Sequence, residues 1–162
     1  MKTIRIALPL LAAALVLGAA GDAQRVGRVC PDPARPCAGF QPHELSFVLP
    51  ADSVARAEIR SDRFWAVIVR SAPRCSIAER DRAALQAHFP REKVFSQRFE
   101  CEDENESENI VTYTNVNPNA AFLAVYGGET RDRAEAVLRR VEALRRYPGA
   151  NVRRMQAVRV SP

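Results

Sequence analysis

The sequence has 162 residues, with 24 Lys and Arg against 19 Asp and Glu, which gives a modest formal net charge of +5 at pH 7. This length suits one domain with a hydrophobic core, and no repeat or change in composition indicates a second domain. The chain has no Gly-x-Ser-x-Gly motif, phosphate-binding loop or dinucleotide-binding fingerprint, which argues against the enzyme classes that use them.

Residues 1–23 have the pattern of a secretory signal peptide. Lys2 and Arg5 make a positive start, and an apolar run and then small residues follow. The apolar run is shorter than the roughly 20 residues that a transmembrane helix needs. We predict cleavage after Ala23, with cleavage after Ala20 and an uncleaved core helix as the alternatives. Cleavage leaves a periplasmic or secreted protein of 139 residues with no membrane span.

The chain has four cysteines, Cys30, Cys37, Cys75 and Cys101, all in the part expected to be exported. An oxidising compartment permits disulfides, and four cysteines allow three pairings. We favour Cys30 with Cys37, which closes a short proline-containing loop, and Cys75 with Cys101. No pair has the Cys-x-x-Cys spacing of a zinc site, so a thiolate metal site is the weaker interpretation. We expect no metal and no cofactor.

Residues 24–60 form the first part of the mature chain. Five prolines between residues 24 and 50 and the lack of periodicity predict an extended arm, tied down by its own cysteine loop. Residues 53–60 fit either a short turn or a strand.

Regular signals begin with the β-branched and aromatic run at residues 64–70, which predicts a buried strand. Ser76 and Glu79 have the spacing of a capping box, and a helix is expected to follow as far as Phe89. Alternating residues at 93–99 predict the second strand.

The second half starts with a loop at residues 100–109, in which six of ten residues are carboxylates. Residues 109–117 are strand-like and fit an extra hairpin arm. A clear strand follows at 120–126. Thr130 can cap a helix with apolar residues at i, i+3, i+4 and i+7, and residues 152–160 predict the last strand.

The order of these elements is β-α-β-β-α-β. It predicts an α+β fold of the split β-α-β sandwich type over residues 61–162, with an antiparallel four-stranded sheet in the order 4-1-3-2 and two helices on one face. Strands one and two then end at the same edge of the sheet. Cys75 and Cys101 follow these two strands, which gives a second reason to pair them.

Residues 122–128 read Phe-Leu-Ala-Val-Tyr-Gly-Gly and run directly into an Ala-containing helix at 131–146, before the strand at 152–160. Together with the strand at 64–73, this pattern resembles the SPOR family over residues 64–160. SPOR domains are small bacterial envelope domains that bind the glycan strands of peptidoglycan, especially strands stripped of their peptides. The resemblance implies an exported, non-enzymatic binding module of the cell envelope.

Strand alternation locates the surface where a glycan would bind. If Val67 and Val69 point at the helices, residues of the opposite parity lie on the open face of the sheet. We expect the glycan-binding residues there: Ile68, Arg70, Phe122, Tyr126, Arg154 and Gln156. A bulge in the last strand would reverse the choice of the last two. The alternative is that the proline-rich arm covers this face and its aromatic residues fill a core.

An enzyme needs a nucleophile with a base, or a pair of acids, in a suitable setting. His43 is in a predicted loop and His88 near a helix end, and they are the only imidazoles, so we expect no enzyme. Nine arginines fall between residues 131 and 159, but interspersed carboxylates and export argue against a nucleic-acid partner. The expected partner is peptidoglycan or another envelope polymer. The alternative is an envelope protein, bound by a protease-inhibitor or propeptide-like module of the same topology.

Overall fold

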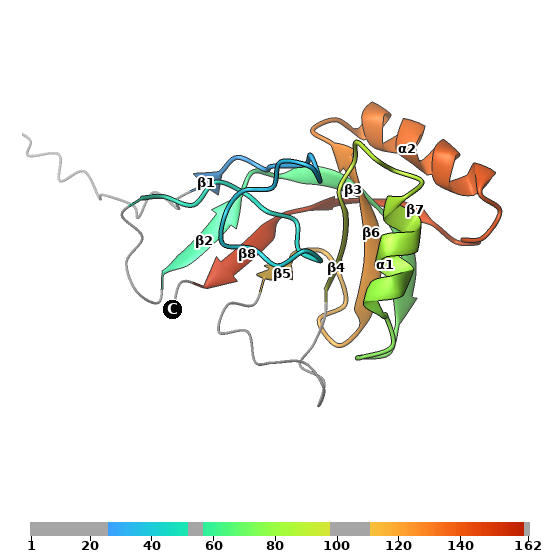
Figure 1. Cartoon of the computed structure of the whole chain (residues 1–162), viewed down its shortest axis with the longest axis horizontal. Helices are drawn as coiled ribbons and strands as arrows, with labels where there is room; N and C mark the ends of the chain where they lie inside the picture. Colours follow the sequence, from blue (N-terminus) through green and yellow to red (C-terminus); the bar gives the residue numbers. More distant parts are fainter. Residues whose placement is uncertain (1–25, 52–56, 98–110, 161–162) are drawn as a thin grey trace, which may run out of the picture.

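The computed structural model describes residues 26–51, 57–97 and 111–160. The described residues form eight strands and two helices, and the strands make two sheets of four (Figure 1). The elements are β1 (Val26–Gly27), β2 (Glu58–Ser61), β3 (Phe64–Ala72), α1 (Glu79–Gln86), β4 (Val94–Gln97), β5 (Val111–Tyr113), β6 (Ala121–Gly128), α2 (Arg131–Ala143), β7 (Asn151–Met155) and β8 (Ala157–Val160).

One sheet, here called the helix-covered sheet, has the strand order β4-β6-β3-β7. All its neighbouring strands are antiparallel. In order of appearance, β3, β4, β6 and β7 are the four strands predicted for the sandwich, so their order is the predicted 4-1-3-2. The α+β class is therefore confirmed, and so is the order within this sheet.

The other sheet, here called the second sheet, has the order β1-β2-β8-β5. The prediction of one four-stranded sheet is wrong because the last predicted strand is divided at Gln156. β7 belongs to the helix-covered sheet, whereas β8 pairs with β2 and β5. The Gln156 side chain donates to the carbonyl of Ser61 (2.9 Å), and the Ser61 hydroxyl accepts from the N–H of Ala157 (2.9 Å). These bonds hold the chain where it changes sheets, drawn in red in Figure 1.

Helix α2 forms as its sequence predicts. The Thr130 side chain accepts a hydrogen bond from the N–H of Arg133 (3.4 Å), and Ala134, Val137 and Val141 are buried against the sheet. Its apolar stripe packs on the odd-numbered face of β3, where Val67 belongs to the same core.

Helix α1 begins later than the capping box predicts. Its N-cap is Ala78, which makes no side-chain cap, and the Ser76 hydroxyl donates to the carbonyl of Pro73 instead. Glu79 forms an ion pair with Arg82. The predicted capping box is thus wrong, because Ile77 turns into the core under the helices before the first helical turn.

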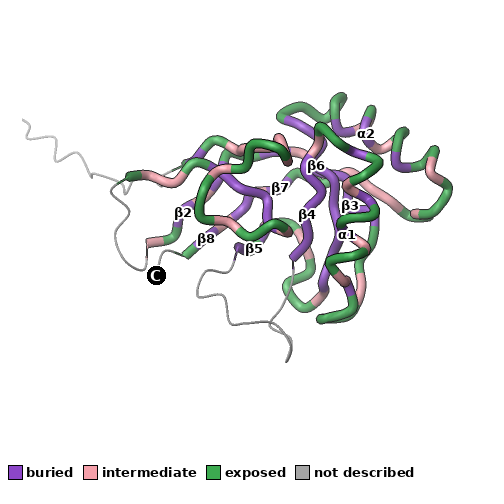
Figure 2. Tube along the Cα trace, viewed as in Figure 1, coloured by how far each residue is buried: buried purple, intermediate pink, exposed green. Residues whose placement is uncertain are grey.

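The opposite face of the helix-covered sheet is not open. Leu45 and Phe47 of the arm are fully buried on it, and Tyr113 of the second sheet packs against Phe122 with ring centroids 5.4 Å apart. Figure 2 shows the buried stretches of β3, β4 and β6 that result. The prediction of an open face is therefore wrong, and the alternative, an arm that covers aromatic core residues, describes this face. The core residues here are Leu45, Phe47, Ile59, Phe64, Ala66, Ile68, Phe95, Val111, Tyr113, Phe122, Ala124, Tyr126, Met155 and Ala157.

The arm is held in shape by local pairing. Cys30 and Cys37 form the predicted disulfide, with Cα atoms 5.8 Å apart. The N–H of Cys30 donates to the carbonyl of Ser46 (2.9 Å). A Cβ at Gly27 would lie 2.0 Å from the carbonyl oxygen of Val48, so this close approach of two backbones requires glycine.

Cys75 does not carry a free thiol. Cys101, its predicted partner, lies outside the described residues, so this pairing stays a prediction. The predicted signal peptide at residues 1–23 and the acidic loop at 100–109 also lie outside them. Among the helices of the described ranges, none is long and apolar enough to cross a membrane.

A buried carboxylate anchors the arm to the second sheet. Glu44 is 6% exposed, and its carboxylate accepts hydrogen bonds from the N–H groups of Gln41 (2.8 Å) and Val111 (3.3 Å). Burial raises the pKa of Glu44. These N–H groups and the charges of Arg159 and Lys93 lower it by less.

Two buried cations bind carbonyls of the arm. The Lys93 ammonium, next to β4, donates to the carbonyl of Pro42 (2.6 Å). The Arg159 guanidinium, on β8, donates to the carbonyl of Gly39 and stacks 4.8 Å from the ring centroid of Phe40. Each sheet therefore contributes one cation to the arm, and a buried cation without its carbonyl would be costly.

We expect Phe47→Ala to lower the free energy of unfolding by about 3–5 kcal/mol, because it opens a cavity in a fully packed core. The neighbouring Val48→Ala is the control, since Val48 is 44% exposed, and we expect it to cost about 0.5 kcal/mol. Urea unfolding of the three proteins measures the difference. Equal losses for the two variants would show that the arm does not pack on the sheet.

The raised pKa of Glu44 makes a pH-dependent contribution to stability. The folded protein binds the Glu44 proton more tightly than the unfolded chain, in which the pKa of this carboxyl is 4.5. The stabilising contribution is therefore present below pH 4.5 and is lost as the pH rises through the pKa of Glu44 in the folded protein. We expect Glu44→Gln to gain stability relative to the native protein as the pH rises above 4.5, because the native protein alone loses this contribution. Urea unfolding at several pH values tests this, and a constant difference across the range would contradict it.

Candidate functional site

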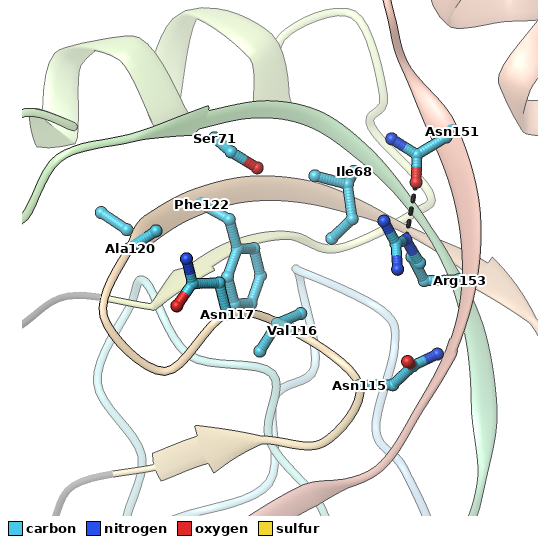
Figure 3. Close-up of a pocket in the computed structure, with 10 residues that line it drawn as sticks. Ile68, Ser71, Asn115, Val116, Asn117, Ala120, Phe122, Asn151 and Arg153 are labelled. Carbon is cyan, nitrogen blue, oxygen red and sulfur yellow. Dashed lines mark hydrogen bonds between the residues drawn. The ribbon is translucent and has the colours of Figure 1, made fainter.

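A pocket of about 410 Å³ opens at one end of the helix-covered sheet. We call it the asparagine pocket, because three asparagines from two segments lie around it (Figure 3). It is lined by Ile68, Ser71, Asn115, Val116, Asn117, Ala120, Ala121, Phe122, Asn151 and Arg153.

The floor of the pocket is apolar and comes from the covered face of the sheet. Ile68 of β3 is opposite Asn151 of β7, and Ser71 is opposite Phe122 of β6. Ile68 is 6% exposed and Phe122 is 2% exposed, so both are core residues whose outer surface forms the floor. The floor is rigid because it belongs to two paired strands.

The β7 side of the pocket presents a positioned cation. The Asn151 Oδ1 accepts a hydrogen bond from Arg153 Nε (2.8 Å), and the Asn151 amide group donates to the carbonyl of Gly149 (3.2 Å). Both terminal nitrogens of Arg153 have no partner among the described residues. Asn151 therefore orients the Arg153 guanidinium and leaves its outer donors available to a ligand.

The loop between β5 and β6 supplies the other asparagines. The Asn117 Oδ1 accepts from the N–H of Asn119 (2.9 Å), which is an Asx turn and leaves the Asn117 amide group without a partner in the described chain. Asn115 has φ +60° and donates to the carbonyl of Arg154 (3.2 Å). Asn117 is thus a candidate ligand donor, whereas Asn115 shapes the loop.

The structure brings two of the predicted site residues, Ile68 and Phe122, into this pocket. Arg70 is elsewhere, because a register shift between Ile68 and Arg70 changes the alternation of β3. Its guanidinium forms an ion pair with Asp81 of α1 at 3.4 Å. The prediction that Arg70 lies on the same face as Ile68 is therefore wrong.

In the last strand, the residues on the pocket face are displaced by one position from the prediction. Arg153 is opposite Ala66 and Arg154 is opposite Trp65, so Arg153 lies on the pocket face and Arg154 on the helix face. Gln156 binds Ser61 where the chain changes sheets. Placing Arg154 and Gln156 on the glycan face is therefore wrong.

Tyr126 lies at the other end of β6, near the start of α2. It is 9% exposed and packs against Phe64 with ring centroids 5.8 Å apart. Burial raises its pKa, with further contributions from the carboxylates of Glu129 and Asp62, while Arg133 lowers it. Tyr126 lies on the predicted face but does not line the asparagine pocket.

The polar half of the site was not predicted from the sequence: Ser71, Asn115, Asn117, Asn151 and Arg153. The loop did carry a signal, because Asn115, Asn117 and Asn119 alternate around Pro118, which is typical of a structured turn. Arg153 was missed because the change of sheets at Gln156 is not visible in the local pattern.

The pocket combines an apolar floor, neutral amide donors and one guanidinium. This arrangement suits a polar, largely uncharged ligand that has one apolar face and hydrogen-bond acceptors around it. Within the described ranges, no group of three or more His, Cys, Asp or Glu side chains is placed to hold a metal ion.

No family model, curated protein or solved structure matches this chain. The resemblance to the SPOR family therefore stays a prediction.

Proposed function

We propose that this protein is an exported, non-enzymatic binding module of the bacterial cell envelope, and that the asparagine pocket binds the glycan strands of peptidoglycan. The observation that carries the proposal is the pairing of an apolar floor, Ile68 and Phe122, with the donors of Asn117 and Arg153.

The chemistry of the ligand fits this pairing. An N-acetylated sugar presents C–H groups on one side of its ring and hydroxyl and acetamido oxygens at its edges. The apolar floor can pack against the ring, and the amide group of Asn117 can donate to an acetamido oxygen. Glycans stripped of their peptides also expose carboxylates, which match the free end of the Arg153 guanidinium.

This proposal moves the glycan site predicted from sequence. The arm and the second sheet cover most of the face on which Ile68 and Phe122 lie. At the end of the sheet the cover stops, and these two residues line the asparagine pocket. The ligand would therefore bind at the end of the sheet instead of lying across it.

Export rests on two observations that agree. The first residues have the charge and apolar pattern of a signal peptide, and the Cys30–Cys37 disulfide is typical of an oxidising compartment.

Binding to purified sacculi tests the function. We expect the full chain to sediment with sacculi, and to be retained more strongly after an amidase has removed the stem peptides, because that treatment exposes the glycan and its carboxylates. The absence of retention on both materials would overturn the proposal.

Arg153→Ala tests the pocket itself. We expect it to weaken retention by about tenfold, which is the loss of one charge-assisted hydrogen bond. Arg154→Ala is a matched control, because it makes the same change of charge in the same strand on the opposite face of the sheet. Equal losses for the two variants would show that binding depends on general charge and not on the pocket.

A further inference from the structure

A second pocket, of about 380 Å³, lies at the other end of β6. We call it the arginine pocket. Four residues of α2 at i, i+3, i+4 and i+7 form one wall, the segment before β4 forms another, and the arm closes it through Pro31. Its lining residues are Pro31, Arg91, Glu92, Tyr126, Gly127, Gly128, Arg133, Ala136, Val137 and Arg140.

The charges that line this pocket are predominantly positive. Arg91, Arg133 and Arg140 face one carboxylate, Glu92. Glu92 binds Arg140 through both oxygens, at 2.5 and 3.3 Å, and Arg140 also lies 4.8 Å from the ring centroid of Phe89. Arg140 is therefore already neutralised and fixed in place.

The other two guanidinium groups are not neutralised. Neither Arg91 nor Arg133 makes an ion pair or a side-chain hydrogen bond with any described residue, although each lines the same cavity. Two like charges at one cavity repel each other, and an anion placed between them would remove that repulsion.

Glycine fixes where Arg133 lies. Gly128 has φ +112°, and a Cβ there would come within 3.2 Å of the Arg133 Cβ and 3.4 Å of its Nε. The Arg133 side chain therefore passes directly over the Gly128 backbone, a path that any side chain at position 128 would obstruct. The absence of a side chain at position 128 therefore leaves room for Arg133 to line the pocket.

Tyr126 adds a neutral donor. It lines the pocket, and its hydroxyl has no hydrogen-bond partner among the described residues. A phenol is protonated at neutral pH, and burial favours this form further by raising the pKa of Tyr126, so the hydroxyl can donate a hydrogen bond to an anionic oxygen.

We propose that the arginine pocket binds a phosphate or carboxylate group of an anionic ligand, held by the guanidinium groups of Arg91 and Arg133 with the Tyr126 hydroxyl as a third donor. Planar guanidinium groups bind both kinds of group through paired hydrogen bonds. This site is separate from the asparagine pocket, and the proposal does not depend on glycan binding.

The test is a titration of the full chain with inorganic phosphate and, separately, with acetate, at constant ionic strength in chloride. Amide chemical shifts in NMR spectra report where the anion binds. We expect saturable shifts at Gly127, Gly128 and Arg133. Tighter binding of phosphate would assign a phosphate group, and tighter binding of acetate a carboxylate. If neither anion causes saturable shifts at these residues, the proposal is overturned.

Two variants change the affinity in opposite directions. Arg133→Ala should weaken anion binding by about tenfold, because it removes one of the two free guanidinium groups. Glu92→Gln should strengthen it by a few fold, because it releases Arg140 from its carboxylate.

Arg139→Ala is the control, because Arg139 is exposed on the same helix, outside the pocket, and gives the same change in net charge. It should leave the affinity within about twofold, since salt screens a charge that lies outside the pocket. A loss for Arg139→Ala equal to that for Arg133→Ala would also overturn the proposal, because it would show that only the net charge attracts the anion.

Discussion

The structure depends on covering the face of the helix-covered sheet that the two helices leave bare. That face carries Phe64, Phe95 and Phe122, and aromatic side chains of this size are costly to leave in water. Both helices pack on the other face of the sheet and do not cover it. The arm and the second sheet bury it instead, with Phe47 fully enclosed and Tyr113 packed against the Phe95 ring at 5.1 Å. The predicted arm is thus part of the core and not an appendage.

Covering that face with irregular chain creates a second problem, because the arm brings backbone polar groups and charges into the interior. Each buried charge has hydrogen-bond partners. Glu44 accepts hydrogen bonds from two backbone N–H groups, and Lys93 and Arg159 each donate to a backbone carbonyl of the arm. Such buried polar contacts have strict geometry, whereas apolar packing tolerates several arrangements. They therefore help to fix one position of the arm between the two sheets, at the energetic cost that the raised pKa of Glu44 reports.

The part of this fold that is encoded locally could be predicted. The β-branched run of β3, the apolar stripe of α2 and the Thr130 cap act over a few residues, and they locate these elements. The succession of elements along the chain then indicates the class and the strand order of the helix-covered sheet. Features decided by distant contacts could not be predicted. The bulge that turns Arg70 toward α1, and the change of sheets that turns Arg153 and not Arg154 into the pocket, each shift the alternation by one residue. The site was therefore half predicted: its floor follows from local alternation and its polar rim does not.

The positions of both pockets are determined by how much of β6 the arm and the second sheet cover. β6 runs through the core, and its covered middle is closed to any ligand. Near its start, Phe122 reaches the asparagine pocket where the second sheet no longer covers it, and at its end Tyr126 reaches the arginine pocket between α2 and the arm. One pocket has an amide rim with a single guanidinium, and the other is lined by three arginines and one carboxylate. A single strand thus supports two sites of different chemistry, and because the arm and the second sheet limit what each end exposes, the packing that stabilises the fold also determines where ligands can bind.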